Sequence, residues 1–377
     1  MVYGGRSSEH EVSLASAAAV IANLDPARYE PIPIAIDQTG RWSIADHPPT
    51  ALSTAEVIQR TRIGKSGADP PSLEAHLIAH PTKETLVTIQ RNVDQHPTNA
   101  TIDGMVLDVV FPVVHGPYGE DGTLQGLLEL ANVPYVGAGV LSSAVSMDKG
   151  VAKILFAARQ LPILAYEVVA GHNWDTETDR VLDRISKRFS FPVFVKPANL
   201  GSSIGVSKAS SRSELHEALE RAREFDDKLL VEAAVPNARE LECAVLGNEN
   251  PTSSVPGEIV PAHEFYDYES KYLDDGSRLI IPAKLTDEQT NSVRAMALEA
   301  FHAVEGAGMA RVDFLMDRGD ERIYLNEVNT IPGFTTISMY AKLWDASGLS
   351  YPALLERLIE LALARHRRKQ RLRTSLT

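Results

Sequence analysis

The segment IYLNEVNTIPGFT, residues 323–335, decides how the fold of this chain is interpreted. Residues Ile323–Val328 are typical of a short strand, and the turn residues of Thr330–Gly333 end it. Because side chains alternate between the two faces of a strand, Glu327 and Asn329 are expected on the same face. The segment therefore predicts a strand that carries a carboxylate and an amide on one face near its end.

A second strand is predicted just upstream, over Met309–Met316, where Arg311 and Asp313 share one face. If the two strands pair as a hairpin, Asp313, Glu327 and Asn329 converge on one point. Three oxygen ligands that leave room for water and phosphate suit Mg²⁺. The alternative is a solvated polar face of an antiparallel sheet. The apolar composition of both segments and the Pro-Gly turn favour the metal site.

Size and composition limit the classes of protein to which the chain can belong. It has 377 residues, enough for two or three domains of about 100–200 residues each. Hydrophobic residues make up 44 % and charged residues 23 %, as in ordinary globular proteins. The net charge of −13 and the pI of about 5.4 argue against a nucleic-acid partner, but not against a nucleotide.

Three further features predict where the protein works. The single cysteine, Cys243, excludes an intramolecular disulfide framework and fits a reducing compartment. No run of about 18 apolar residues indicates a membrane span. Gly4–Arg6 interrupts any apolar core of a signal peptide. We therefore expect a cytoplasmic protein with no membrane partner.

The chain opens like an α/β unit. Met1–Tyr3 resembles the end of a strand, a glycine-rich loop follows, and a helix is predicted over Glu9–Asn23. Ligands are expected at the carboxyl end of such a strand. Acidic residues in the first turn complement the helix dipole, and this explanation suffices for Glu9. A further strand is predicted over Tyr29–Ile36.

The rest of the first segment contains one strong signal. Val106–Val114 is a nearly continuous apolar run, which predicts a strand buried on both faces and ending at His115. A lone histidine is more often structural than functional. Residues 45–100 carry four histidines in no zinc-binding pattern, and surface loops explain them better. A helix is predicted over Thr123–Ala131.

The central segment is expected to bind phosphate. One helix is predicted over Ser146–Arg159, with Lys149 and Lys153 one turn apart on one side. A strand over Phe191–Pro197 places Lys196 at its end, next to a loop of small residues. Such a loop lets backbone N–H groups approach phosphate oxygens, and a lysine adds a point charge.

Three further features follow this loop. The strand Leu229–Glu232 ends in an acid that can accept a hydrogen bond from the exocyclic amine of adenine. A half-buried strand is predicted over Glu240–Leu246. The aromatic, charged stretch 263–283 is typical of an active-site lid. Helices are predicted over Asp287–Glu305 and Pro352–Arg365.

Taken in order, these features resemble the D-alanine–D-alanine ligases of the ATP-grasp superfamily over nearly the whole chain outside residues 45–100. The matching motifs are Gly4–Ser13, His115–Gly116, Gly119–Gly122, Met147–Lys149, Lys196–Pro197, Gly201–Gly205, Ala238–Glu240, Tyr266–Glu269, Lys271–Tyr272, Arg311–Asp313 and residues 323–335. The resemblance implies an α/β, three-domain ATP-grasp fold with an N-terminal open-sheet α/β domain. Its expected divisions are 1–141, 142–235 and 236–377.

The resemblance also implies a two-step reaction, in which ATP phosphorylates one D-alanine and the amine of a second attacks the acyl phosphate. It assigns ATP to Lys149, Lys196, Ser203, Glu232, the backbone of Ala233 and Val235, Glu240, Lys271 and Asn326. Phe265 is expected to stack on adenine, because Ala234 stands where some members have an aromatic residue.

The remaining implied roles concern the metal and the substrates. Two Mg²⁺ ions, or Mn²⁺, are expected at Asp313, Glu327 and Asn329. D-Alanine is assigned to Glu11, His115, Arg311, Gly333, Ser338 and Met339. Arg311 and the N–H of Gly333 are expected to stabilise the oxyanion. Glu11, Ser202 and Tyr272 are expected to form a hydrogen-bonded triad that closes the lid.

Three alternatives remain open. A ligase that makes D-alanyl-D-lactate is the nearest, although Tyr272 favours an amine acceptor. A ligase of the same superfamily acting on a purine intermediate is disfavoured by the opening motif at Glu9–Ser13. A nucleotide-binding protein without catalysis is disfavoured by the intact set of charged residues. A homodimer is implied by the resemblance alone.

Overall fold

The structure is a computed structural model that describes residues 1–49, 56, 73–91, 100–261, 278–335 and 337–373. Predictions that concern Phe265, Lys271 and Tyr272, and the lid over 263–283 as far as residue 277, lie outside the described residues. In the part of the chain that is described, no helix is both long and apolar enough to span a membrane.

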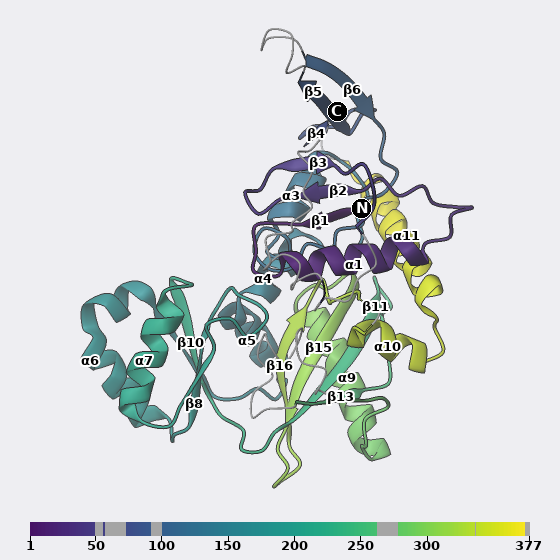
Figure 1. The fold of residues 1–377 in the computed structure, drawn as a ribbon. Helices are drawn as coiled ribbons and strands as arrows, with labels where there is room; N and C mark the ends of the chain where they lie inside the picture. The colour runs from purple at the N-terminus through teal and green to yellow at the C-terminus, as the bar shows by residue number, and fades with distance from the viewer. Residues whose placement is uncertain (50–55, 57–72, 92–99, 262–277, 336, 374–377) are drawn as a thin grey trace.

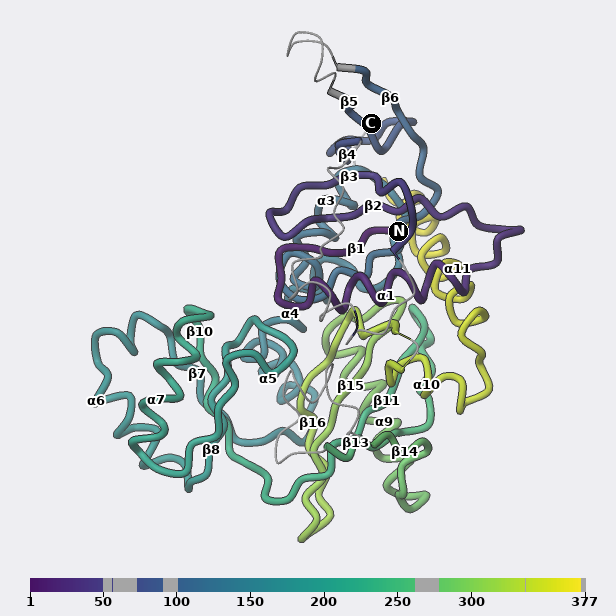
Figure 2. The backbone as a smooth tube through the Cα atoms, in the orientation of Figure 1, coloured from purple at the N-terminus to yellow at the C-terminus, as the bar shows by residue number. Residues whose placement is uncertain are grey.

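The first sheet is built from the N-terminal part of the chain. Its strands, in spatial order, are β1 (Val2–Gly4), β2 (Ile34–Ile36), β3 (Trp42–Ile44), β4 (Leu73–Leu77), β5 (Leu86–Arg91) and β6 (Ala100–Met105). β1 and β2 are parallel, and the other neighbours are antiparallel. The β5–β6 hairpin projects from the body of the molecule (Figures 1 and 2). The prediction of surface loops over residues 45–100 was therefore wrong for β4 and β5.

Two other strand predictions for this region need correction. Over Val106–Val114 the chain forms only isolated bridges, from Val110 to Tyr135 and from Pro112 to Val2, and Val106 is 60 % exposed. Proline lacks the N–H that a ladder requires, so the run cannot continue as a central strand. The strand expected from Tyr29 begins only at Ile34, after Pro31 and Pro33.

Helix α1 (His10–Asn23) follows the first strand as predicted, and α3 (Thr123–Leu130) also lies where a helix was expected. The single helix predicted over Ser146–Arg159 is instead part of two helices, α4 (Val140–Met147) and α5 (Lys149–Ala158). Asp148 separates them, because its backbone is extended and its side chain accepts a hydrogen bond from the N–H of Val151 at 3.0 Å.

The second sheet forms a small unit with its own core. Its strands, in spatial order, are β7 (Tyr166–Ala170), β10 (Lys228–Ala233), β8 (Val193–Pro197) and β9 (Ser207–Ala209). Helices α6 (Gly171–Arg188) and α7 (Arg212–Arg223) pack against it, with Trp174, Ile185 and Leu219 in the core. This unit lies to one side of the molecule (Figures 1 and 2).

The third sheet contains the predicted hairpin. Its main strands, in spatial order, are β14 (Arg278–Ile280), β13 (Gly257–Val260), β11 (Arg239–Gly247), β15 (Gly308–Met316) and β16 (Ile323–Asn329), and β12 (Thr252–Ser253) pairs with β11. β15 and β16 are antiparallel, with Asp313 opposite Glu327 and Arg311 opposite Asn329. The hairpin and the shared face of these four side chains are confirmed.

Helices cover both faces of the third sheet. α5 and α9 (Asp287–Ala303) contribute to the core on one face, where Val312 and Phe314 are buried. On the other face lies a core shared by the sheet, α10 (Met339–Ala346), α11 (Tyr351–Lys369) and the N-terminal part of the chain. The domain boundaries at 141 and 235 remain predictions, although α5 packs with the third sheet rather than with the second.

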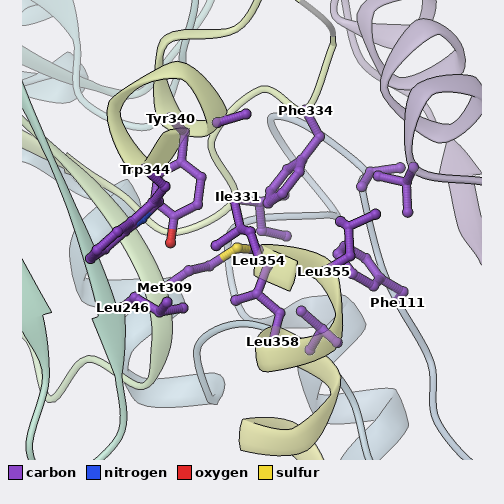
Figure 3. Packing of buried hydrophobic residues seen from close by; sticks show 14 of the residues in the cluster. Phe111, Leu246, Met309, Ile331, Phe334, Tyr340, Trp344, Leu354, Leu355 and Leu358 are labelled. Carbon is purple, nitrogen blue, oxygen red and sulfur yellow. The ribbon is translucent and has the colours of Figure 1, made fainter. Parts of the chain in front are cut away.

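The shared core fixes the N-terminal unit against the third sheet. Figure 3 shows Phe111 close to Phe334, with ring centroids 5.8 Å apart and an angle of 88° between the rings. Tyr340 lies in the same cluster and donates a hydrogen bond to the carbonyl of Val245 at 2.9 Å. The hairpin's carboxyl end, at Ile331, is therefore anchored between two units of the fold.

Candidate active site

The hairpin acids contact basic side chains from two elements, β15 and α5. Arg311 donates two hydrogen bonds of 2.7 Å to Asp313, and Asn329 donates one of 2.9 Å to the same carboxylate. Lys149, at the start of α5, lies with its Nζ 3.6 Å from Oε2 of Glu327. The face that was predicted from strand alternation is therefore a cluster of opposite charges.

Arg311 is held by a second acid that sequence reasoning missed. Glu242, on β11, lies opposite Asp313 in the sheet and 3.1 Å from Nε of Arg311. Burial alone would lower the pKa of Arg311, but the charges of Asp313 and Glu242 outweigh it and raise the pKa. The alternation of β11, which puts Glu240 and Glu242 on one face, was the available signal.

A second cluster surrounds Glu232 at the end of β10. Lys196, on β8, donates a hydrogen bond of 2.8 Å to Oε2 of Glu232 and lies 3.4 Å from Oδ1 of Asn326. Lys153 contacts Oε1 of the same carboxylate. Burial alone would raise the pKa of Glu232, but the charges of Lys153 and Lys196 outweigh it and lower the pKa to about 2. Glu232 is therefore an ionised, buried hydrogen-bond acceptor.

The loop of small residues that follows β8, residues 199–206, was predicted to bind phosphate and is called the phosphate loop here; Lys149 contacts its start. The backbone N–H of Lys149 donates to the carbonyl of Ala198 at 3.0 Å, and its Nζ donates to the carbonyl of Leu200 at 2.6 Å. Ser202 and Ser203 have positive φ angles of 51° and 58°. Non-glycine residues rarely adopt this conformation, and such residues concentrate at functional sites.

The triad predicted from Glu11 needs correction. Ser202 donates a hydrogen bond to Oε1 of Glu9, whereas Glu11 accepts one of 3.4 Å from Gln38. Glu9 is buried, at 7 % exposure, and precedes the first residue of α1. Side chains two positions apart on a helix point in directions about 200° apart, so only one of these acids can face the loop. The dipole explanation that was given for Glu9 is insufficient.

The side chains of His115 and Glu120 lie near enough to Glu9 to interact with its charge. Nδ1 of His115 donates to the carbonyl of Ile331 at 3.1 Å, and Nε2 lies 3.2 Å from the hydroxyl of Ser16. Burial lowers the pKa of His115, so the ring is neutral. Glu120 accepts hydrogen bonds from the N–H groups of Gly116 at 2.7 Å and Ile331 at 3.2 Å. Its pKa is raised by burial and by the nearby charge of Glu9.

The turn after β16 lies next to these two side chains, because Ile331 contacts both His115 and Glu120. An added Cβ at Gly333 would lie 3.0 Å from Oγ of Ser338, so the glycine backbone closely approaches this serine. Ser338 also accepts a hydrogen bond of 2.9 Å from the N–H of Thr335. The side chain of Met339 is buried in the shared core, so only its backbone could serve a substrate. The substrate roles of these residues remain predictions.

The predicted nucleotide residues lie beside Glu232. Ala233 ends β10, and its N–H donates to the carbonyl of Ala165 at 2.9 Å, with Val235 two residues further on. Glu240 is in β11. Burial alone would lower the pKa of Lys196, but the charges of Glu232, Glu327 and Glu240 outweigh this effect and raise the pKa.

The site as a whole combines cations that suit phosphate with carboxylates that suit a divalent metal. Lys149, Lys196 and Arg311 supply the positive charges, and Asp313 and Glu327 supply hard oxygen ligands. Lys196 of the second sheet contacts Asn326 of the third, and the Glu9–Ser202 contact joins the phosphate loop to the N-terminal unit. This arrangement defines a protein of the ATP-grasp class.

Comparisons with known proteins identify the family. Two family models match, the D-ala D-ala ligase N-terminus over residues 1–138 and the D-ala D-ala ligase C-terminus over residues 155–360. The chain therefore belongs to the D-alanine–D-alanine ligase family. It is 47 % identical to a D-alanine–D-alanine ligase of Heliobacterium modesticaldum over 371 residues, covering 98 % of this chain and 96 % of the relative.

Solved structures agree with this assignment. The D-alanine–D-alanine ligase from Coxiella burnetii has a TM-score of 0.77 and 36 % identity, covering 98 % of this chain and 94 % of the other. The VanG D-Ala:D-Ser ligase from Enterococcus faecalis has a TM-score of 0.75 and 32 % identity, covering 96 % and 98 %. The fold and family implied by the sequence motifs are confirmed.

Proposed function

We propose that the protein joins two D-alanine molecules to D-alanyl-D-alanine, with conversion of ATP to ADP and phosphate, for the synthesis of peptidoglycan precursors. The observation that carries this proposal is the position of Lys149. The Nζ atom of Lys149 lies 2.6 Å from the carbonyl oxygen of Leu200 in the phosphate loop and 3.6 Å from Oε2 of Glu327 on the hairpin. A triphosphate that displaced these contacts would lie between the loop and the hairpin.

In the first step, a carboxylate oxygen of one D-alanine attacks the γ-phosphorus, and the bond to ADP breaks. In the second step, the amine of the other D-alanine attacks the acyl carbon. Loss of a proton from nitrogen and expulsion of phosphate then give the peptide. Arg311 and the N–H of Gly333 stabilise the oxyanion, while Glu9, which replaces Glu11 in this role, binds the ammonium group of the first D-alanine.

Asp313, Glu327 and Asn329 would hold Mg²⁺, or Mn²⁺, which supplies positive charge against the phosphates. The donor set supports this assignment, since it consists of two carboxylates and an amide on one face of the hairpin. Arg311 and Lys149 neutralise these carboxylates in the structure, so the carboxylates already pair with positive charge.

Release of ADP by the purified protein tests the proposal. We expect release with D-alanine and Mg²⁺, and little release with L-alanine or without an amino acid. Equal ADP release in all three conditions would show an ATPase, and no ADP release in any of them would show a nucleotide-binding protein without catalysis. Parallel reactions with D-lactate and D-serine as acceptors test the amine preference, and more ester than peptide at neutral pH would indicate the D-lactate type of ligase.

The metal assignment has its own test. Glu327→Gln keeps the shape of the side chain but removes a charge, so we expect turnover to fall by roughly 100-fold or more and half-maximal activity to need more Mg²⁺. Glu299→Gln, at an exposed position on α9, is the matched control. An unchanged magnesium titration for Glu327→Gln would place the metal elsewhere.

We also propose a homodimer that works in the cytoplasm. The proposal of a dimer rests on the family resemblance. The proposal of a cytoplasmic location rests on the single buried cysteine and on the nature of the substrates. Sedimentation at several protein concentrations tests the dimer, and a concentration-independent monomer would exclude it.

A further inference from the structure

Lys153 is a buried cation whose role is not explained by phosphate binding. It lies one turn after Lys149 in α5, and its side chain is 2 % exposed. Its amino group contacts Oε1 of Glu232 and lies 5.8 Å from the centre of the Tyr166 ring. A buried ammonium group is costly unless it is paired, so this lysine depends on Glu232 and Glu232 depends on it.

The two lysines that flank Glu232 are not equivalent. Lys196 is 14 % exposed, and it also approaches Asn326 on the hairpin strand β16, so it can serve a bound nucleotide directly. Lys153 lies deeper and contacts the opposite carboxylate oxygen. Lys196 can therefore turn towards a ligand while Lys153 keeps the carboxylate paired.

We propose that Lys153 is a positioning residue for recognition of the nucleotide base, because it keeps Glu232 ionised and oriented as a pure hydrogen-bond acceptor. This inference rests on the proposed function and on the role predicted from the sequence for Glu232, which is to accept a hydrogen bond from the exocyclic amine of adenine. An ionised carboxylate can only accept hydrogen bonds. It therefore favours the 6-amino group of ATP and disfavours the 6-carbonyl of ITP or GTP, which also only accepts.

The charge of Lys153 should therefore control base specificity rather than catalysis. Without it, Glu232 has one cation instead of two, and it is free to rotate or to bind a proton. A protonated carboxyl group can donate a hydrogen bond to a 6-carbonyl. Loss of Lys153 is thus expected to weaken ATP binding and to relax discrimination against ITP. Binding of D-alanine, which uses other residues, should not change.

The test is Lys153→Met, which removes the charge and keeps the length of the side chain. Steady-state kinetics at saturating D-alanine should give a KM for ATP raised about tenfold and a ratio of kcat/KM between ATP and ITP lowered about tenfold. The kcat and the KM for D-alanine should stay within about twofold of the parent. Lys153→Arg should restore most of the discrimination, and Lys187→Met, at an exposed position on α6, is the matched control.

Glu232→Gln separates this inference from the proposed function. If Lys153 acts through Glu232, adding Lys153→Met to Glu232→Gln should not change the ATP-to-ITP ratio further. An unaltered ratio in an active Glu232→Gln variant would overturn the adenine role of Glu232 itself. An altered ratio in Glu232→Gln with a parental ratio in Lys153→Met would overturn only the role of Lys153. If Lys153→Met fails to fold, Lys153→Gln is measured instead, and the same outcomes decide.

Discussion

Glu9 and Glu11 are only two residues apart, yet they meet different surroundings. Glu9 accepts a hydrogen bond from Ser202, and Glu11 accepts one from Gln38. We expect Glu9→Gln to lower kcat/KM for D-alanine about 10- to 100-fold, because a charge-assisted contact to a buried carboxylate is lost. Glu11→Gln should stay within about twofold of the parent. Initial rates at varied D-alanine concentration measure both.

Thermal unfolding of both variants serves as the control, and we expect both to keep the parental transition. Ser202→Ala should lower kcat/KM in the same direction as Glu9→Gln, and the two changes should not be additive. A larger loss for Glu11→Gln than for Glu9→Gln would instead support the assignment made from the sequence.

Site residues whose neighbours follow from strand alternation were predictable from the sequence. Site residues whose neighbours depend on the tertiary structure were not. Asp313 and Glu327 follow from a period of two along the hairpin. The choice between Glu9 and Glu11 depends on where the first turn of α1 points, and the helix dipole explains either residue equally well. Lys153 and Glu242 were visible as charged residues, but only the packing of α5 and the register of β11 give them partners.

At the scale of elements, Asp148 decides where α5 begins. Its carboxylate accepts the N–H of Val151 and also pairs with Lys228, at 2.7 and 2.8 Å. We expect Asp148→Ala to lower the free energy of unfolding by about 1–2 kcal/mol through loss of the cap and the ion pair. Asp148→Asn keeps the cap and should cost about 1 kcal/mol or less.

Urea denaturation followed by circular dichroism measures both changes as shifts of the midpoint at constant slope. Equal losses for the two variants would mean that the ion pair with Lys228, and not the cap, provides the stabilisation.

The elements themselves were predicted unevenly, for physical reasons. Long amphipathic or apolar segments such as α9, β15 and β16 were found close to their observed limits. The break at Asp148 was missed because helical periodicity continues across it. The strands β4 and β5 were missed because they are short, lie among turn residues and pair with strands that carry no strong pattern.

At the scale of the whole molecule, Arg365 fastens α11 to the N-terminal unit. It donates hydrogen bonds to the carbonyls of Tyr135, at 3.0 Å, and Gly137, and it lies 4.5 Å from the centre of the Tyr135 ring. We expect Arg365→Met to lower the free energy of unfolding by about 1–3 kcal/mol, since two carbonyls lose a charged donor.

Arg367→Met, at an exposed neighbouring position, should change the stability by less than about 0.5 kcal/mol. Chemical denaturation of the two variants side by side makes the comparison. A parental midpoint for Arg365→Met would show that Arg365 is not needed to hold α11 against the N-terminal unit. That core, with Phe111 and Phe334 in contact, joins residues far apart in the sequence, so the sequence predicted three units but not how they are joined.

The unit formed by β7, β8, β9 and β10 with α6 and α7 has a hydrophobic core separate from the two that stabilise the third sheet. A separate core permits separate opening, so amide hydrogens of residues 166–233 should exchange with solvent as one cooperative group, ahead of the strands β11 and β15. Nucleotide bound between Lys196 and the hairpin should slow this exchange, while D-alanine alone should not. Mass-spectrometric deuterium uptake would then report the affinity for ATP without any measurement of catalysis.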